Sequence, residues 1–546
     1  MTKYNKFQSV VYQIYPRSFN DSNGDGIGDI NGIIEKLDYL EKLGVDYIWS
    51  TPFFISPQND NGYDVADYYS IDPLFGSMSD VETLIKEANK RNIKIMFDMV
   101  FNHTSTAHEW FLKALAGDKE YQEYYFFKDK DEIANWQSKF GGSAFEYVDH
   151  LDQYYLHLFD VTQADLNWEN PAVFNELTHI IEFWLDKGVH GFRFDVINLV
   201  SKPDVFLDDD HGDGRRFYTD GPKIHEHLKR LNQQSFGKHE NILTVGEMSS
   251  TSLEDGVLYA SEERHELSMI FNFHHLKVDY KDNQKWNVQA FDFQMLKDTW
   301  IDWQLAMQEH QAYSAVFYNN HDQPRVNSRF GDDINYPFES ATVFTTAIHM
   351  MRGMPYIYQG EEIGLPNAYF SSLEDYRDVE SINMYHILMK QHQDHNKVIN
   401  ILQAHSRDNA RTPIPWDNHQ KNYGFTNGQP WIDFSKHPKL KSVQEDQNSK
   451  QSIFKYYQKL IAYRKSYPII SEGHINFIDI DHSELFVFER TYNNQTLLVI
   501  TNHYGKDVPY TINPHGTILL SNVNRTSIKK ELTLQPYEAL VLLYED

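Results

Sequence analysis

Residues 189–195 read Val-His-Gly-Phe-Arg-Phe-Asp, an apolar run that ends on a charged side chain. The run follows an amphipathic stretch that opens at Asn170-Pro171, keeps its apolar residues on one face and stops at Gly188. Proline at the start and glycine just past the end are typical of a helix, and a short apolar run is typical of a buried strand. The stretch therefore predicts a helix followed by a strand with Asp195 at its end.

The same alternation of apolar runs and helical patterns extends in both directions, from Val10 to about Gln359. The other apolar runs are Val10–Ile14, Val45–Ser50, Ile93–Val100, Ile242–Glu247, Met269–Asn272, Ala315–Asn319 and Pro355–Gln359. Ser79 and Glu82 predict a capping box for one of the intervening helices. Strand–helix alternation repeated eight times favours an α/β fold of the closed (β/α)₈ type. An open doubly wound sheet would need a glycine-rich phosphate loop after its first strand, and the sequence has none there.

Two segments depart from this alternation. Residues 104–169 are polar and aromatic with no clear helical period, which indicates an inserted domain after the third strand. From about Gly473 the pattern changes to short period-two runs, typical of an antiparallel β domain. We expect a barrel in two parts (1–103 and 170–472), the inserted domain (104–169) and a C-terminal β domain (473–546).

Composition excludes several classes of protein. The 50 Lys and Arg against 78 Asp and Glu give a net charge of −28, which argues against nucleic-acid binding. Cysteine is absent, so disulfides, thiolate nucleophiles and cysteine zinc sites are excluded. We see neither a signal-peptide pattern near the N-terminus nor an apolar run of about 18 residues, and expect a cytoplasmic location with no membrane contact. No obligate protein partner is indicated.

Charged and polar side chains stand where the predicted strands end. Asp195, Glu247 and Asp322 follow three different strands, together with His103 and His321 at strand ends and Arg193 within a strand. In a barrel of this type, groups at the C-terminal ends of the strands converge on one mouth. Each acid alone could cap the following helix, but capping does not explain the whole assembly.

A pair of carboxyl groups, one of them protonated, is the requirement for cleaving a glycosidic bond. Arg193 lies two residues before Asp195 on the same face of the strand and would keep that carboxylate ionised. Retaining glycosidases hold the two carboxyl groups ~5–5.5 Å apart, a distance that neighbouring strand ends can supply. These residues favour glycoside hydrolysis without naming the sugar.

Five blocks then carry a resemblance to the α-amylase family of glycoside hydrolases. They are Asp98–His103 (DMVFNH), Gln163–Trp168 (QADLNW), Gly191–Asp195 (GFRFD), Val245–Met248 (VGEM) and Asn319–Asp322 (NNHD). The resemblance implies that Asp195 is the nucleophile, Glu247 the general acid/base and Asp322 a carboxylate that stabilises the transition state. It implies retention of configuration and no organic cofactor. The residues implied to hold the glucose ring of the −1 subsite are Asp60, Tyr63, His103, Arg193 and His321, and Arg411 matches a further arginine near that subsite.

Within the family the chain resembles the oligo-1,6-glucosidase branch, whose members act on short substrates from the non-reducing end. Val196, directly after the implied nucleophile, fits the preference of that branch for α-1,6 or trehalose-like bonds over maltose. Further segments resemble the phospho-α,α-trehalases, which cleave trehalose 6-phosphate to glucose and glucose 6-phosphate. These segments are Tyr154–Phe159, Asp213–Pro222, Gly246–Ser252 and Phe271–Tyr280.

A phosphorylated disaccharide requires cations near the +1 sugar, even in an acidic protein. Lys277 closely follows the sixth strand and Lys285 lies eight residues later, so both are candidates for binding the phosphate. Arg215 and Arg216, in the loop after the fourth strand, are further candidates. Lysines in loops are commonly just solvated, and that reading stays open.

The loop after the first strand alternates oxygen-bearing residues in a pattern that suits a hard cation. Its candidate ligands are Asp21, Asn23, Asp25, Ile27 and Asp29. The loop departs from an EF-hand, because its twelfth position is Gly32. Members of the oligo-1,6-glucosidase branch carry calcium in a matching loop, so the resemblance implies a structural Ca²⁺ outside the chemistry. The alternative is an Asn/Asp-rich turn that caps the next helix.

Aromatic and histidine residues give weaker signals. We expect Phe145 and the segment Lys139–Gly142 to form the rim of the pocket, and Tyr121–Phe127 to pack within the inserted domain. His274 and His275 have no spaced third ligand, which favours a structural role over metal binding.

Two other functions compete with a phosphotrehalase. The first is an oligo-1,6-glucosidase, or an isomerase of sucrose or trehalose, acting on unphosphorylated substrates. The second is a non-enzymatic homologue like the barrel ectodomain of amino-acid transporter heavy chains, which predicts loss of the three carboxylates and an N-terminal membrane helix. The sequence has neither property.

Overall fold

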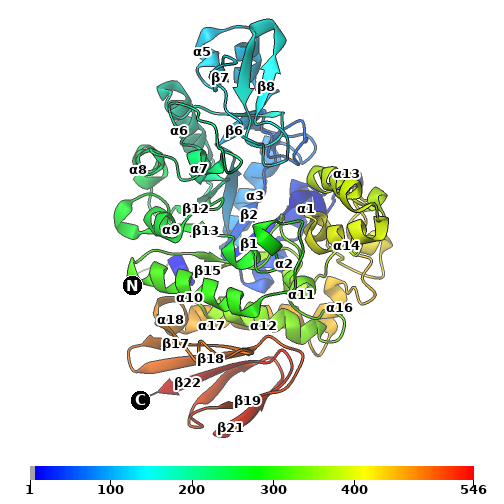
Figure 1. The fold of residues 1–546 in the computed structure, drawn as a ribbon. Helices are drawn as coiled ribbons and strands as arrows, with labels where there is room; N and C mark the ends of the chain where they lie inside the picture. The colour runs from blue at the N-terminus through cyan, green and yellow to red at the C-terminus, as the bar shows by residue number, and fades with distance from the viewer. Residues whose placement is uncertain (1–5, 546) are drawn as a thin grey trace.

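Eight parallel strands form the centre of the molecule in the computed structural model, which describes residues 6–545 (Figure 1). Their order in the sheet is β13-β12-β11-β5-β2-β1-β15-β14. A parallel bridge between Ile270 and Ser314 joins the first strand of this order to the last and closes the barrel. The strands are β1 (Val11–Ile14), β2 (Tyr47–Ser50), β5 (Lys94–Met99), β11 (Gly191–Phe194), β12 (Leu243–Glu247), β13 (Met269–Phe271), β14 (Ala315–Val316) and β15 (Met354–Tyr358).

Each barrel strand lies within or beside one of the eight predicted runs, so the predicted fold class is confirmed. The runs are apolar on both faces because the strands are covered by helices outside and by packed side chains inside. Strand β14 is shorter than expected and ends at Val316. Beyond it the chain turns, and the Asn319 side chain accepts a hydrogen bond from the Val326 N–H at 2.7 Å.

Two helices show how local sequence sets their ends. Helix α6 (Pro171–Asp186) begins as predicted, with the Asn170 side chain accepting from the backbone N–H of Ala172. Helix α3 (Met78–Lys90) differs from the prediction, because its capping box is formed by Ser77 and Asp80. Ser77 has the extended backbone that a cap requires, whereas Ser79 already lies inside the helix. The predicted box at Ser79 and Glu82 is therefore wrong.

Further helices cover the barrel and connect its strands. They are α1 (Ile30–Glu35), α2 (Leu37–Leu43), α8 (Ile224–Gln234), α9 (Leu253–Ala260), α10 (Phe293–Glu309), α12 (Pro337–Met350) and α17 (Ile453–Ser466). Among the described residues, no helix is both long and apolar enough to cross a membrane.

The segment between β5 and α6 extends beyond one end of the barrel, at the top of Figure 1. It begins with β6 (His103–Ser105), which pairs antiparallel with β10 (Gln163–Asp165). Its own sheet has the order β7-β9-β8, with strands Phe127–Lys128, Gln153–Leu156 and Phe145–Val148. It also contains two helices that we did not predict, α4 (Glu109–Leu115) and α5 (Lys119–Gln122). Both are too short to show a helical period in the sequence.

The C-terminal region forms an antiparallel β domain at the opposite end of the molecule from the β7-β9-β8 sheet (Figure 1). Its larger sheet has the order β16-β17-β18-β22-β20, and β19 pairs with β21 separately. This part of the predicted fold is confirmed. The strands are β16 (His474–Ile478), β17 (Leu485–Tyr492), β18 (Gln495–Asn502), β19 (Val508–Thr511), β20 (Thr517–Ser521), β21 (Glu531–Leu534) and β22 (Ala539–Glu545).

A pair of helices beyond the last barrel strand was not predicted. Helix α13 (Val379–His392) and helix α14 (His395–His405) pack against each other and are joined at Gln393, which has a left-handed backbone. The start of α13 carries Glu380, and Arg407 follows the end of α14. The pair therefore brings two charged residues to one place from opposite ends of its sequence.

Candidate active site

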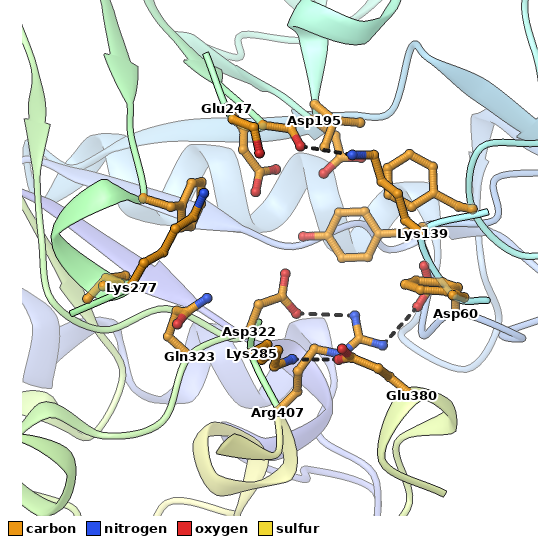
Figure 2. A pocket seen from close by; sticks show the side chains of 18 of the residues that line it. Asp60, Lys139, Asp195, Glu247, Lys277, Lys285, Asp322, Gln323, Glu380 and Arg407 are labelled. Carbon is orange, nitrogen blue, oxygen red and sulfur yellow. Dashed lines mark hydrogen bonds and ion pairs between the residues drawn. The ribbon is translucent and has the colours of Figure 1, made fainter. Parts of the chain in front are cut away.

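A cavity of about 300 Å³ lies where the predicted strand ends meet (Figure 2). Acids, cations and aromatic side chains share its wall. The residues that line it are Asp60, Tyr63, His103, Lys139, Phe140, Phe159, Asp195, Val196, Glu247, Ser249, Ser250, Phe273, Leu276, Lys277, Tyr280, Lys285, Asp322, Gln323, Glu380 and Arg407. The structure thus brings the three predicted catalytic carboxylates into one cavity.

The backbone at the strand ends positions these carboxylates. Asp195 directly follows β11, and its N–H donates to the Met99 carbonyl of β5 at 2.9 Å. Val196 then adopts φ +35°, a left-handed conformation that is strained for a β-branched residue. The sharp turn leaves both side chains lining the cavity. Glu247 is the last residue of β12.

Arg193 joins the acids beneath the cavity. Its guanidinium is 2% exposed and donates to Asp98 and Asp195, each at 2.6 Å, while its second terminal nitrogen contacts Glu247. Asp98 also accepts hydrogen bonds from Trp49 and from the hydroxyl of Tyr63. One buried cation therefore fixes the separation of the Asp195 and Glu247 carboxyl groups.

Burial and charge separate the pKa values of the two acids. Burial raises the pKa of Glu247 to about 8, and the charges of Asp195 and Asp322 add to the increase. Burial also raises the pKa of Asp195, but Arg193 opposes it and the value is about 6. At pH 7 Glu247 is mainly protonated and Asp195 mainly ionised, which is the arrangement required of a proton donor and a nucleophile.

Asp322 lies among cations on the other side of the cavity. Its carboxylate is 2.8 Å from Arg411, 3.4 Å from Arg407 and 3.3 Å from the ring of His321. Burial alone would raise the pKa of Asp322, but His321, Arg407 and Arg411 outweigh it and hold the pKa well below its usual range. Asp322 is therefore a fixed negative charge facing the other two acids.

Aromatic and polar side chains complete the floor. The rings of Tyr63 and His321 are parallel, with centroids 5.3 Å apart, and the Tyr63 hydroxyl is 2.8 Å from Nε2 of His321. His103 is 3.0 Å from the Tyr63 carbonyl. The Gln163 amide lies 3.1 Å from both His103 and Asp60. All residues predicted for the −1 subsite therefore lie in or directly beneath the cavity.

Arg407 and Glu380 are cavity residues that the sequence analysis missed. Arg407 pairs with Asp378 at 2.6 Å and with Glu380 at 3.4 Å. It also contacts Asp60 at 3.6 Å (Figure 2). Asp378 is also shared with Arg411, at 3.3 Å. Arg407 lies in the motif Arg407–Pro413 from which only Arg411 was selected, so the motif itself was the available signal.

The predicted phosphate-binding cations differ in their surroundings. Lys277 and Lys285 both line the cavity, and Lys285 pairs with Glu380 at 2.6 Å. Arg215 and Arg216 do not line it, and they pair with Asp213 and Asp209 instead.

The prediction for the rim of the cavity is right for Lys139 and Phe140 and wrong for Phe145. Lys139 and Phe140 line the cavity, whereas Phe145 packs in a buried cluster with Trp136 and Phe206. Because successive side chains of a strand point to opposite faces, an aromatic residue at a strand start can face either the core or a site. Phe145 faces the core.

The loop after β1 shows the capping that we gave as the alternative to calcium. Asp29 accepts from the Gly32 N–H at 2.6 Å and so caps α1, and Asp21 accepts from the backbone N–H groups of Asn23, Gly24 and Gly26. Within residues 6–545, no three His, Cys, Asp or Glu side chains form a group that could hold a metal ion. His275 is buried against Trp300 and contacts the Phe317 carbonyl, in line with a structural role.

Comparisons with known proteins agree with this geometry. Residues 13–473 match the catalytic domain of alpha amylase, and residues 485–541 match the alpha-amylase SusG C-terminal domain. Trehalose-6-phosphate hydrolase of Bacillus subtilis (strain 168) is 48% identical over 98% of this chain and 97% of that enzyme. The enzyme of the same name from Escherichia coli (strain K12) is 47% identical, over 97% of each chain.

A relative with a different named activity and a solved crystal structure are also similar to this chain. An oligo-1,6-glucosidase of Parageobacillus thermoglucosidasius is 45% identical over 98% of each chain. The crystal structure of Bacillus licheniformis trehalose-6-phosphate hydrolase has a TM-score of 0.95 to this chain at 48% identity and covers 99% of both. The matches extend over nearly the whole sequence, and the chain belongs to the α-amylase family of glycoside hydrolases.

Proposed function

We propose that this chain is a retaining α-glucosidase that hydrolyses trehalose 6-phosphate to glucose and glucose 6-phosphate. The observation that carries the proposal is the Asp195–Arg193–Glu247 arrangement opposite Asp322, in a cavity whose wall also carries Lys277 and Lys285. The two relatives named trehalose-6-phosphate hydrolase support the choice of substrate.

In the first step Asp195 attacks the anomeric carbon of the glucose in the −1 subsite. Glu247 donates its proton to the glycosidic oxygen, the bond between that oxygen and the anomeric carbon breaks, and glucose 6-phosphate leaves. The glucose is then held as an ester of Asp195. Arg193 is bonded to both acids, so it keeps Asp195 ionised and holds the two groups at the short separation that retention requires.

In the second step Glu247, now ionised, removes a proton from water. The resulting hydroxide attacks the anomeric carbon, the ester bond to Asp195 breaks, and glucose is released with its original configuration. Both transition states carry positive charge on the sugar ring, and Asp322 is the fixed negative charge that stabilises it. Its pairing with Arg411 and Arg407 keeps it ionised.

The remaining cavity residues bind and orient the two sugars. Asp60, Tyr63 and His103 line the cavity and bind the −1 glucose, and Val196 shapes the cavity beside the nucleophile. His321 and Arg411 lie beneath, against Tyr63 and Asp322, and complete this subsite. Lys277 and Lys285 bind the phosphate on the +1 sugar. The Lys285 ammonium is paired with Glu380. To bind the substrate, it must therefore donate a hydrogen bond to the phosphate beside, or in place of, its bond to Glu380.

A comparison of three substrates tests this function. We expect kcat/KM for trehalose 6-phosphate to exceed that for trehalose and isomaltose by roughly a hundredfold, because charge-assisted bonds to phosphate are lost with the other two. Equal rates on isomaltose and trehalose 6-phosphate would instead support an oligo-1,6-glucosidase, to which 45% identity is also found.

The loop after β1 is proposed to hold a structural calcium ion, as the family resemblance implies. Asp21, Asn23 and Asp25 would supply side-chain oxygens, Ile27 a carbonyl and Asp29 a third carboxylate, which is the ligand chemistry that Ca²⁺ takes. Bound calcium would stiffen this loop. We expect EDTA to lower Tm and added Ca²⁺ to restore it, and Asp25→Ala to remove that response.

The cytoplasmic location expected from the cysteine-free composition remains a prediction.

A further inference from the structure

Lys139 lies in the wall of the cavity on a tight turn of the segment between β5 and α6. The turn is closed by the Ser138 N–H, which donates to the Gly142 carbonyl, and by the Gly141 N–H, which donates to the Ser138 carbonyl, each at 3.0 Å. The Lys139 N–H donates to the Leu158 carbonyl at 2.8 Å. Gly141 and Gly142 both have positive φ, which closes the turn tightly. The backbone of Lys139 is therefore fixed, and its side chain enters the cavity.

The ammonium group of Lys139 has polar and aromatic neighbours but no counter-ion. Its Nζ is 3.2 Å from the Ser249 hydroxyl and lies over the rings of Tyr218 and Phe159, at 5.7 Å and 6.0 Å. Among residues 6–545 no carboxylate pairs with Lys139 at ion-pair distance. A partly buried cation without a counter-ion is costly, and the cost is recovered when an anion binds beside it.

Figure 2 shows Lys277 entering the same cavity from the side opposite Lys139. The positive charge of Lys277 lowers the pKa of Lys139, so the two ammonium groups are near enough to repel each other. Arg215 lowers the pKa of both lysines. A doubly charged phosphate group placed between these cations would reduce their mutual repulsion, so their arrangement suits such a ligand.

We infer that Lys139 is a specificity-determining residue that binds the substrate phosphate together with Lys277, from the opposite side of the cavity. This inference rests on the proposed function, because the phosphate belongs to the substrate proposed above. It adds to the sequence-based candidates a cation from a different part of the fold, and it makes the β5–α6 segment part of the recognition of the charged sugar.

A proton should accompany the phosphate into the site. Burial, with Arg215 and Lys277 nearby, lowers the pKa of Lys139 to about 7, while Asp213 and Asp165 oppose this. A bound phosphate dianion favours the charged ammonium and raises that pKa. Near neutral pH part of the free enzyme therefore holds Lys139 as the neutral amine, and we expect binding to take up a fraction of a proton.

The test compares Lys139→Met, which keeps the length of the side chain, with Lys139→Arg, which keeps the charge. The control is Lys130→Met, a change of the same charge at an exposed lysine of the same segment that does not line the cavity. We expect Lys139→Met to raise KM for trehalose 6-phosphate by about 10- to 100-fold and to change kcat/KM for an uncharged chromogenic α-glucoside less than threefold. Lys139→Arg should recover most of the loss.

Titration calorimetry with glucose 6-phosphate at pH 7.5, in two buffers of different ionisation enthalpy, gives a second readout that does not depend on turnover. Wild-type protein should take up a fraction of a proton on binding, and Lys139→Met should take up less. Equal losses on both substrates, or glucose 6-phosphate binding as tight in Lys139→Met as in the wild type, would overturn the inference. If wild-type enzyme does not prefer trehalose 6-phosphate to trehalose, the proposed function fails and the inference falls with it. A preference for trehalose 6-phosphate over the uncharged glucoside that is undiminished in Lys139→Met overturns the inference alone.

Discussion

The floor and the wall of the cavity are built from different parts of the chain. The floor consists of side chains at barrel strand ends, such as Asp195 and Glu247, tied together by the buried Arg193. The wall comes from connecting segments: Lys139 from a turn, Lys277 from the loop after β13 and Glu380 from the start of α13. The parallel ladder fixes the floor, whereas the wall depends on contacts between loops.

This difference indicates a division of labour. A rigid floor suits bond cleavage, which needs acids at fixed separations, while loops can change the substrate without disturbing the chemistry. If the division is right, a change in the floor lowers activity on every substrate, and a change in the wall lowers activity only on the phosphorylated one. Four measurements test this, in order of expected effect.

The largest effect is expected from the acids of the floor. Asp195→Ala and Glu247→Gln should each lower kcat by about a thousandfold or more on charged and uncharged substrates alike, because they remove the nucleophile and the proton donor. Circular dichroism and Tm should show a folded barrel. Glu254→Gln, at an exposed position in α9, serves as the control. Near-full activity in either active-site variant would show that the assigned roles are wrong.

Arg407 tests the border between floor and wall. Arg407→Gln removes the guanidinium from Asp378, Asp60 and Asp322 and should lower kcat/KM about 30- to 100-fold on both substrates, with a loss of stability of about 3–5 kcal/mol. Denaturant unfolding measures the second quantity. Arg377→Gln is the matched control, since the Arg377 side chain donates to backbone carbonyls. A loss confined to the phosphorylated substrate would place Arg407 in the wall.

Lys277 tests the wall itself. Lys277→Ala should raise KM for trehalose 6-phosphate about 10- to 30-fold and leave the uncharged chromogenic glucoside almost unaffected, because only the phosphate loses a charge-assisted bond. Steady-state kinetics on both substrates separates the two effects. Parallel losses would mean that this lysine does not bind the phosphate.

The pH profile gives the smallest change and reports on the floor alone. With the uncharged glucoside, kcat/KM should fall below pH 6, where Asp195 becomes protonated and cannot attack, and above pH 8, where Glu247 loses the proton it must donate. One unit beyond either limit the loss is about tenfold. Lys139→Met should keep both limits. A profile without an alkaline decrease would contradict the assignment of Glu247 as proton donor.

The sequence predicted the floor well and the wall only in part: Lys139, Lys277 and Lys285 line the cavity as expected, whereas Glu380 and Arg407 were missed and Phe145 was misplaced. Asp195, Glu247 and Asp322 follow buried strands, and the barrel geometry makes such positions converge. Arg407 and Glu380 belong to the α13–α14 region, which lies beyond the last strand, so no periodicity relates them to the cavity. Phe145 was wrongly placed at the rim because alternation along a strand does not say which face is the core.

Element boundaries show the same limit on a smaller scale. Ser77 and Ser79 are both suitable capping residues, and the extended backbone that selects Ser77 is a property of the folded chain. Asn170 and Gly188 offered no such choice, and helix α6 begins where it was predicted to begin. In the loop after β1, the same acids suit a cation or a helix cap, and the observed bonds of Asp29 establish only the cap.

The barrel has a seam where β13 meets β14. These strands are joined only by the bridge between Ile270 and Ser314 among the described residues, and the Ile270 N–H is 3.4 Å from the Tyr313 carbonyl. By contrast, β11 and β12 pair over four residues of each strand, so the pairing at the seam is weaker. Amide hydrogen exchange should therefore be faster at Ile270 than at Val245. The loop that carries Lys277 leaves β13 directly. A sugar phosphate bound to Lys277 should therefore slow amide exchange at Ile270, so that exchange at this barrel residue reports on phosphate binding.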